Sequence, residues 1–176
     1  MESTIFPGVG IGKVKLGMTL AQVERALGKN HILNAQDGAY TELAWNFASW
    51  TAGFEHGRVV QVGTTLRTQR TTARIGPGTF WLKLVKAFPG GLCTFLFEQP
   101  YGLEYLVPHK GGTQTIFLLH AWPPVGSHWY GYGQKTWFVI NVAVRTPFQP
   151  RPEFARNYPG RCKAGYQKTP LPTSGP

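Results

Sequence analysis

The stretch GMTLAQVERALG, residues 17–28, decides the fold because it is the clearest helix signal in the 176-residue chain. Thr19 and Gln22 stand at the spacing of a capping box, in which each side chain bonds a backbone N–H at the helix start. Gly28 is a natural residue for a left-handed helix end. Three apolar residues fall on one helical face, namely Leu20, Val23 and Leu27. The stretch therefore predicts a short helix that is apolar on one side.

The spacing of this helix recurs 61 residues later. Apolar residues follow Gly17 by six and ten positions, and Leu84 and Phe88 follow Gly78 at the same offsets. Self-similarity over this length indicates two tandem modules rather than a solenoid, which needs more copies. The expected modules span residues 5–70 and 71–145.

Apolar alternation after each predicted helix indicates strands. The predicted strands are 40–47, 58–66, 94–98, 103–107, 115–122 and 135–145, with a hairpin turn at 54–58. Their predicted apolar faces are Leu43, Trp45 and Phe47; Val60, Val62 and Leu66; and Phe138, Ile140, Val142 and Val144. The order helix, strands, helix, strands predicts an α+β fold, in which one antiparallel sheet carries both helices on one face.

Beyond residue 145 the chain becomes rich in proline and basic residues. Seven of the 14 prolines lie between residues 147 and 176. Such a segment lacks the apolar residues to build a core of its own. We therefore expect a basic, Pro-rich C-terminal arm over residues 146–176.

The chain has 18 basic and eight acidic residues, a formal charge of +10. A large positive charge favours polyanionic partners, and residues 56–97 contain no acidic residue at all. One interpretation is a stripe that binds nucleic acid or another polyanion; the other is a solvated face of a basic protein. The residues of the stripe would be Arg58, Arg67, Arg70, Arg74, Lys83, Lys86, Arg151 and Arg156.

A Pro- and Gly-rich segment, AWPPVGSHWYGYG at residues 121–133, carries four large aromatic residues. Rigid aromatic side chains on a loop are typical of protein interfaces and carbohydrate-binding platforms. The alternative is that Trp122 and Trp129 fold back and cap the sheet. The predicted partner-binding residues are Trp122, Trp129, Tyr130 and Tyr132.

Neither a catalytic nor a metal-binding motif is present. The glycine run at residues 8–13 lacks the second glycine of a phosphate-binding loop, because Lys13 occupies that position. The five histidines show no metal-binding spacing, and the few carboxylates show no acid–base pairing. We therefore expect no catalytic residues, metal or cofactor, and keep a small hydrolase or metal enzyme as an alternative because folding can bring distant residues together.

Residues 16–19, LGMT, followed by Gln22-Val23 and Leu27-Gly28, resemble the helix motif of the β-lactamase inhibitory protein family and of the SmpA/OmlA outer-membrane assembly lipoproteins. The tandem arrangement is more similar to the inhibitory family. Residues 75–78 also resemble the opening of the second copy in secreted actinobacterial proteins. The resemblance implies two helix-plus-sheet modules and an extracytoplasmic protein.

The same resemblance favours a disulfide between the two cysteines, Cys93 and Cys162, whereas two free buried thiols are the alternative. Paired cysteines imply a secreted or extracytoplasmic protein, and reduced ones a cytoplasmic protein. The N-terminus lacks the basic and apolar runs of a signal peptide. No window approaches the roughly 18 apolar residues of a membrane span.

The expected function is that of a non-enzymatic, extracytoplasmic binding module. Its partner would be a protein or a cell-envelope polymer, bound through the open face of the sheet and the aromatic loop. The alternatives are polyanion binding through the basic stretch and arm, and a structural subunit of an assembly.

Overall fold

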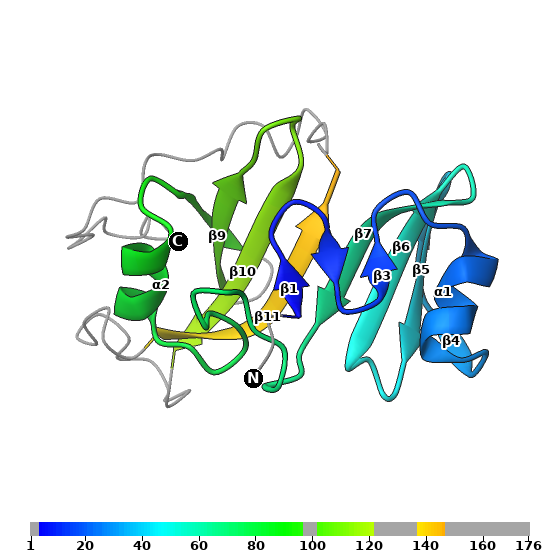
Figure 1. Cartoon of the computed structure of the whole chain (residues 1–176), viewed down its shortest axis with the longest axis horizontal. Coiled ribbons are helices and arrows are strands. Elements are labelled where there is room, and N and C mark those ends of the chain that lie inside the picture. Colours follow the sequence, from blue (N-terminus) through cyan, green and yellow to red (C-terminus); the bar gives the residue numbers. More distant parts are fainter. Residues whose placement is uncertain (1–3, 97–101, 122–136, 147–176) are drawn as a thin grey trace, which may run out of the picture.

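The computed structural model describes residues 4–96, 102–121 and 137–146. Eight antiparallel strands form the main sheet in the order β4-β5-β6-β7-β11-β10-β9-β8 (Figure 1). Its strands are β4 (His31–Asp37), β5 (Tyr40–Trp45), β6 (Trp50–Glu55), β7 (Arg58–Thr64), β8 (Leu92–Leu96), β9 (Gly102–Pro108), β10 (Gln114–Ala121) and β11 (Trp137–Arg145). Each half is a four-stranded meander, and the two halves meet where β7 pairs with β11.

Each meander is preceded by a short helix. In α1 (Leu20–Leu27) the predicted capping box is confirmed: the Gln22 N–H donates to Thr19 Oγ1, and the Thr19 N–H donates to Gln22 Oε1 at 2.8 Å. Gly28 ends this helix as predicted. The second helix, α2 (Trp81–Ala87), begins after Phe80, which makes no side-chain cap. The stability of α2 therefore depends more on its packing against the sheet than the stability of α1 does.

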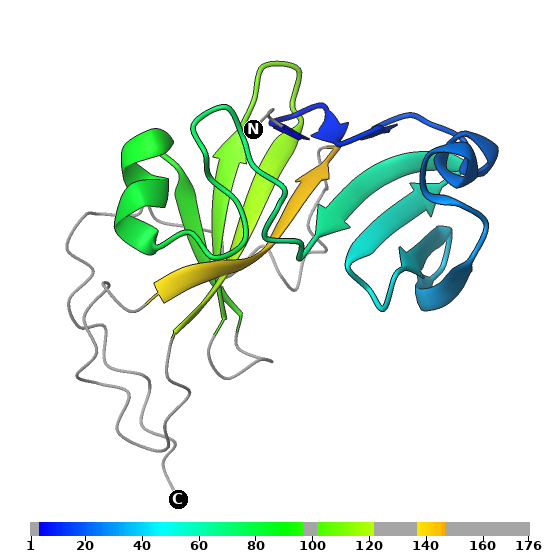
Figure 2. The ribbon, with the colours of Figure 1, turned by 60° about the horizontal axis from the view of Figure 1, so that its bottom comes forward.

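Both helices pack on the same face of the sheet, as Figure 2 shows. Val23 of α1 and Leu84 of α2 are fully buried in one continuous core. The sheet contributes to that core from one face only, through alternate residues. These are Leu43, Trp45, Trp50, Ala52, Phe54, Val59, Val62, Tyr105, Phe117, Leu119, Val139, Val142 and Val144. The expected α+β class is confirmed.

Bulges correct two of the predicted strand faces. The β6–β7 ladder shifts by one residue, so Val59 and Val62 are buried while Val60 is only half-buried. The β10–β11 ladder shifts in the same way, so Val139 rather than Phe138 or Ile140 is buried beside Val142 and Val144. An inserted residue reverses the alternation of side chains, and strict periodicity therefore misassigned both strands.

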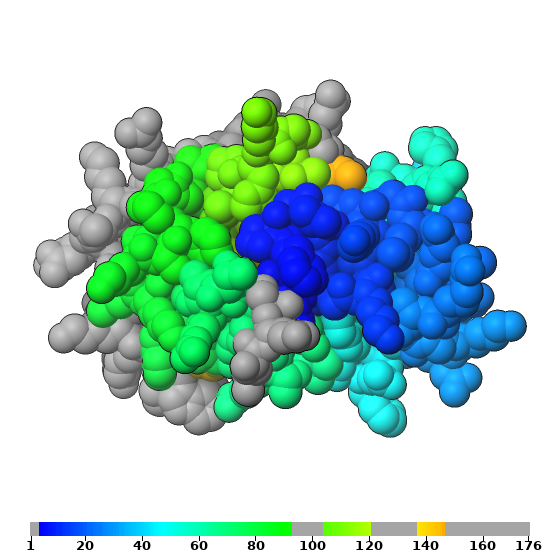
Figure 3. All heavy atoms as spheres, viewed as in Figure 1, coloured from blue at the N-terminus to red at the C-terminus, as the bar shows by residue number. Residues whose placement is uncertain are grey.

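A small three-stranded sheet at the N-terminus was not predicted. It consists of β1 (Ile5–Phe6), β2 (Gly10–Ile11) and β3 (Val14–Lys15), and β2 contacts both β7 and β11. Ile5, Ile11 and Val14 of this sheet are fully buried, whereas Phe6 is exposed, and Figure 3 shows the N-terminal segment in blue packed against the green second half. Two-residue strands are too short for a periodic signal. The glycine run serves this sheet, because a Cβ at Gly10 would lie 2.2 Å from the carbonyl oxygen of Val14.

The strands β4 and β6 were also missed. Nearly every residue of β4 is exposed, so it has no alternation to detect. The strand β6 contains Ala52 and Gly53, which carry little side-chain signal. The predicted hairpin turn between β6 and β7 is confirmed, with its tip at residues 56–57.

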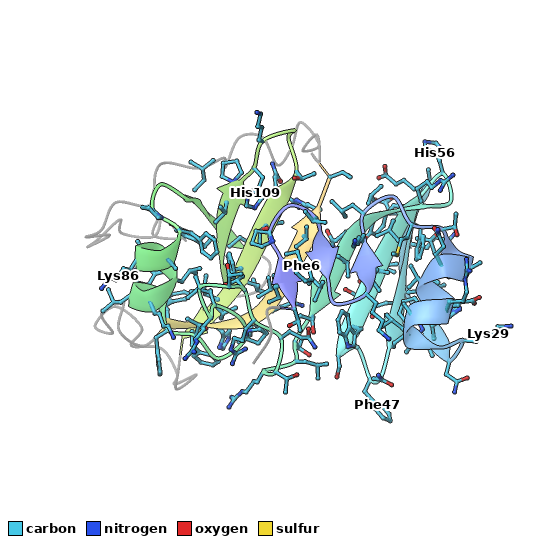
Figure 4. All side chains as sticks on the ribbon, in the orientation of Figure 1. Phe6, Lys29, Phe47, His56, Lys86 and His109 are labelled. Atoms are coloured by element: carbon cyan, nitrogen blue, oxygen red, sulfur yellow. The ribbon has the colours of Figure 1, made fainter. Side chains whose placement is uncertain are left out.

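His109 connects the N-terminal sheet to the main sheet (labelled in Figure 4). Its Nε2 lies 2.8 Å from Oγ1 of the buried Thr115, and the same hydroxyl accepts the backbone N–H of Gly8 at 3.1 Å. Burial lowers the pKa of His109 below its usual 6.5. The neutral imidazole is therefore the form that the fold favours.

We expect the free energy of unfolding to fall as the pH decreases through about 6.5, because His109 then binds a proton more readily in the unfolded chain than in the folded one. Substituting Asn for His109 should flatten this dependence between neutral and mildly acidic pH. Urea unfolding at a series of pH values measures it. His56→Asn, at an exposed turn, is the control, and equal slopes in the two variants would contradict the assignment.

Candidate functional site

The sheet face that points away from the helices carries a row of polar side chains, and we call it the polar face. The row follows direct cross-strand neighbours from β5 to β10. Its members are Glu42, Gly53, Gln61, Arg145 and Gln114. The four with side chains are half-buried, so they are held in place yet remain accessible from this face.

Glu42 is the centre of a hydrogen-bonded group on the polar face. Its Oε2 accepts the hydroxyl of Tyr40 at 2.9 Å and the amide of Gln61 at 3.2 Å. Its Oε1 accepts the amide of Asn34 at 2.5 Å. An ionised carboxylate only accepts hydrogen bonds, so three donors satisfy it well. We call Asn34, Tyr40, Glu42 and Gln61 the Glu42 cluster.

Gly53 makes room for this cluster. A Cβ at Gly53 would lie 2.3 Å from the hydroxyl oxygen of Tyr40, so any other residue would displace the ring. Burial raises the pKa of Tyr40 far above its usual value, and the negative charges of Glu42 and Glu55 raise it further. Tyr40 is therefore a neutral donor at physiological pH.

In the row, Arg145 lies between Gln61 and Gln114. Its Nε donates to Gln114 Oε1 at 3.0 Å. On β9, which pairs with β10, burial raises the pKa of Glu104, and the positive charge of Arg145 partly offsets that rise. Beside them on the same face, Leu106 and Ile116 are buried. The accessible polar surface thus extends from β4 to β10.

The turn between β5 and β6 holds an aromatic side chain in solvent. Asn46, Phe47 and Ala48 all have positive φ, at 48°, 54° and 60°. Phe47 is fully exposed, and Figure 4 shows it pointing away from the body of the protein. Left-handed backbone costs an L-residue roughly 1–2 kcal/mol. The prediction of Phe47 as an inward-facing strand residue is wrong, because β5 ends at Trp45, and no glycine marks the turn.

The predicted aromatic loop residues, Trp122, Trp129, Tyr130 and Tyr132, lie outside the described residues. The strand ends that flank the loop are described: Ala121 pairs with Trp137. Because Trp50 pairs with Thr64, and Thr64 pairs with Val142, these ends point in the same direction as the β5–β6 turn. The strand ends at Ala121 and Trp137 and the turn that carries Phe47 therefore lie toward the same end of the sheet.

The predicted basic stretch is distributed over the molecule. Arg58 begins β7 and donates to the carbonyl of Gly17 at 3.3 Å, whereas Lys83 and Lys86 belong to α2 at the opposite end (Figure 4, where His56 and Lys86 are labelled). Arg67 and Arg70 lie in the loop between β7 and α2. Burial lowers the pKa of Arg70, and the charge of Arg67 lowers it further. The remaining members are Arg74, which is exposed in the same loop, and Arg151 and Arg156, which lie outside the described residues.

No group of three His, Cys, Asp or Glu residues within the described ranges could hold a metal ion. In the same ranges, no helix has both the length and the apolar character to cross a membrane. Cys93 lies in β8 opposite Tyr105 in the ladder. Because Cys162 lies outside the described residues, the disulfide stays a prediction.

Comparison with known proteins adds no relative. No family model matches the chain, and neither a curated protein nor a solved structure matches it. The assignment of the site therefore depends on the geometry of this chain alone.

Replacing Gly53 with Ala should lower the free energy of unfolding by about 1–3 kcal/mol, because the added methyl group displaces Tyr40. In a Tyr40→Ala background the same change should stabilise by up to about 1 kcal/mol, since Ala loses less backbone entropy than Gly in a strand. Chemical denaturation of the four proteins measures this sign reversal. A Gly53→Ala effect that is the same in both backgrounds would contradict the contact.

Proposed function

We propose that this chain is a non-enzymatic, extracytoplasmic binding module that engages a partner protein or an envelope polymer through its polar face and the turn that carries Phe47. The observation that carries the proposal is this turn, in which three consecutive non-glycine residues in left-handed conformation hold an aromatic ring fully in solvent. Backbone strain of this kind persists where it serves a function. Exposed aromatic side chains at such positions anchor partners.

The arrangement beside Phe47 supports the same function. The side chains of the Glu42 cluster are already hydrogen-bonded to one another, so they lose little further freedom when a partner binds. The described strand ends that flank the predicted aromatic loop, Ala121 and Trp137, lie toward the end of the sheet where Phe47 lies. We propose that Trp122, Trp129, Tyr130 and Tyr132 add contacts there.

We also propose that the two halves are tandem modules related to the β-lactamase inhibitory protein and SmpA/OmlA types. Equivalent backbone contacts support this: the Gly17 N–H donates to the Val59 carbonyl, and the Gly78 N–H to the Val139 carbonyl. Gly17 and Gly78 are the residues from which the sequence repeat was measured. The bulges of β7 and β11 also follow Val59 and Val139 directly.

A second candidate function is polyanion binding, and the lowered pKa of Arg70, to which burial and then the charge of Arg67 contribute, favours it. An anionic group such as a phosphate would offset the repulsion between the two guanidinium groups. The separation of Arg58 from Lys86 argues for a local contact rather than a continuous stripe.

An extracytoplasmic location favours a disulfide between Cys93 and Cys162, because disulfides form and persist in oxidising compartments. We expect thiol titration of the denatured, unreduced protein, purified from the cells that produce it, to find no free thiol. The same protein after reduction is the control and should show both. Two free thiols before reduction would instead place the chain in a reducing compartment.

Replacing Phe47 with Gly should weaken partner binding at least tenfold, about 1.4 kcal/mol, because the anchor is lost. The same change should leave stability unchanged or raise it by roughly 1 kcal/mol, since Gly accepts positive φ freely. The partner is first captured by a photo-crosslinking residue in place of Thr51, which lies on the polar face outside the Glu42 cluster, and its affinity is then measured.

Two controls accompany this experiment. A photo-crosslinking residue at Arg25, on the exposed side of α1, should capture nothing. Phe80→Ser, at an exposed aromatic residue on the helix side, should leave affinity unchanged. Capture from position 25 as efficient as from position 51, or full affinity in Phe47→Gly, would overturn the proposal.

A further inference from the structure

We propose that the Glu42 cluster is a subsite for an uncharged, hydroxyl-rich saccharide chain. This inference depends on the proposed function, because it assumes that the polar face is where the partner binds. It adds the chemical class of the ligand and the four side chains that would hold it.

The hydrogen-bonding groups of the cluster suit a ligand with hydroxyl groups. Asn34 and Gln61 each give one N–H to Glu42. Each carboxamide has one further N–H and a carbonyl oxygen, so the pair offers both donors and acceptors beside the carboxylate. A sugar hydroxyl both donates and accepts hydrogen bonds. Two neighbouring hydroxyls can therefore form a pair of hydrogen bonds with one planar amide or carboxylate group.

The shape of the site also suits a chain of sugar rings. Asn34 lies on β4, Glu42 on β5 and Gln61 on β7. Gly53 on β6 has no side chain of its own, and the ring of Tyr40 occupies the space above it. Four strands span about 14 Å at the usual spacing, which is the length of two or three sugar rings. The ring of Tyr40 lies over Gly53, so it adds an apolar surface beside the polar side chains of the cluster.

The local charge selects against acidic ligands. Glu42 and Glu55 both act on Tyr40, and Asp37 lies directly opposite Tyr40 in the ladder. The positive charge of Arg145, opposite Gln61, acts against them. Three acidic residues against this one arginine leave the surroundings of the cluster net negative, in a chain whose formal charge is +10. An acidic polymer would be repelled here, whereas an uncharged sugar does not lose the solvation of a charge on binding.

The test is a titration with two uncharged oligosaccharides, cellotetraose and chitotetraose, and with tetragalacturonate as the acidic comparator. It is followed by the side-chain amide resonances of Asn34 and Gln61 in two-dimensional NMR. We expect saturable shifts of both amides with at least one uncharged sugar and weaker binding of tetragalacturonate. No saturable shift with either uncharged sugar, or tighter binding of tetragalacturonate, would overturn the assignment.

Variants locate the binding. Gln61→Ala and Glu42→Gln should each raise the dissociation constant at least tenfold. Gln36→Ala, which removes the same type of side chain from an exposed position of β4 outside the cluster, should leave it unchanged. A comparable loss in Gln36→Ala, or none in Gln61→Ala, would overturn the assignment, and circular dichroism confirms that each variant is folded.

The two proposals fail in distinguishable ways. If neither sugar binds but the photo-crosslinker at position 51 captures a partner, the saccharide assignment is wrong and the polar-face function stands. The conclusion is the same if a lysine-rich peptide binds where the sugars do not and Glu42→Gln abolishes the binding of that peptide. If no sugar binds and no partner is captured, both proposals are wrong.

Discussion

The antiparallel pairing of β7 with β11 is the contact on which the rest of the structure depends. Four residue pairs, from Gln61 with Arg145 to Thr64 with Val142, join two four-stranded meanders into one sheet. Without this ladder each meander would expose another edge strand, with unpaired backbone groups. The apolar core would also divide between two smaller units, each with less surface to bury.

The same ladder organises both faces of the sheet. On the helix side it brings Val62 and Val144 together under β2, so that the N-terminal sheet covers the joint between the halves. On the other side it places Gln61 opposite Arg145, which makes the polar row continuous from one half to the other. The core and the candidate binding surface therefore depend on one set of backbone hydrogen bonds.

The proposed site includes a locally unfavourable backbone conformation. The turn at Phe47 keeps an aromatic side chain out of the core in left-handed backbone geometry. The structure tolerates this turn because the neighbouring strands are firmly paired and the large aromatic residues Trp45 and Trp50 are buried at its base. Features that do not contribute to stability are the ones most naturally assigned to function.

The sequence by itself determined the features that depend on neighbouring residues. The capping box of α1, the α+β class and the turn before Arg58 follow from the types and spacing of residues that are near one another in the chain. The bulges at Val60 and Ile140, the outward position of Phe47 and the Glu42 cluster required the tertiary structure. Each of these depends on the register between strands distant in the chain, and one residue of shift exchanges the two faces of a strand. Register is set by packing over the whole sheet, which no local pattern contains.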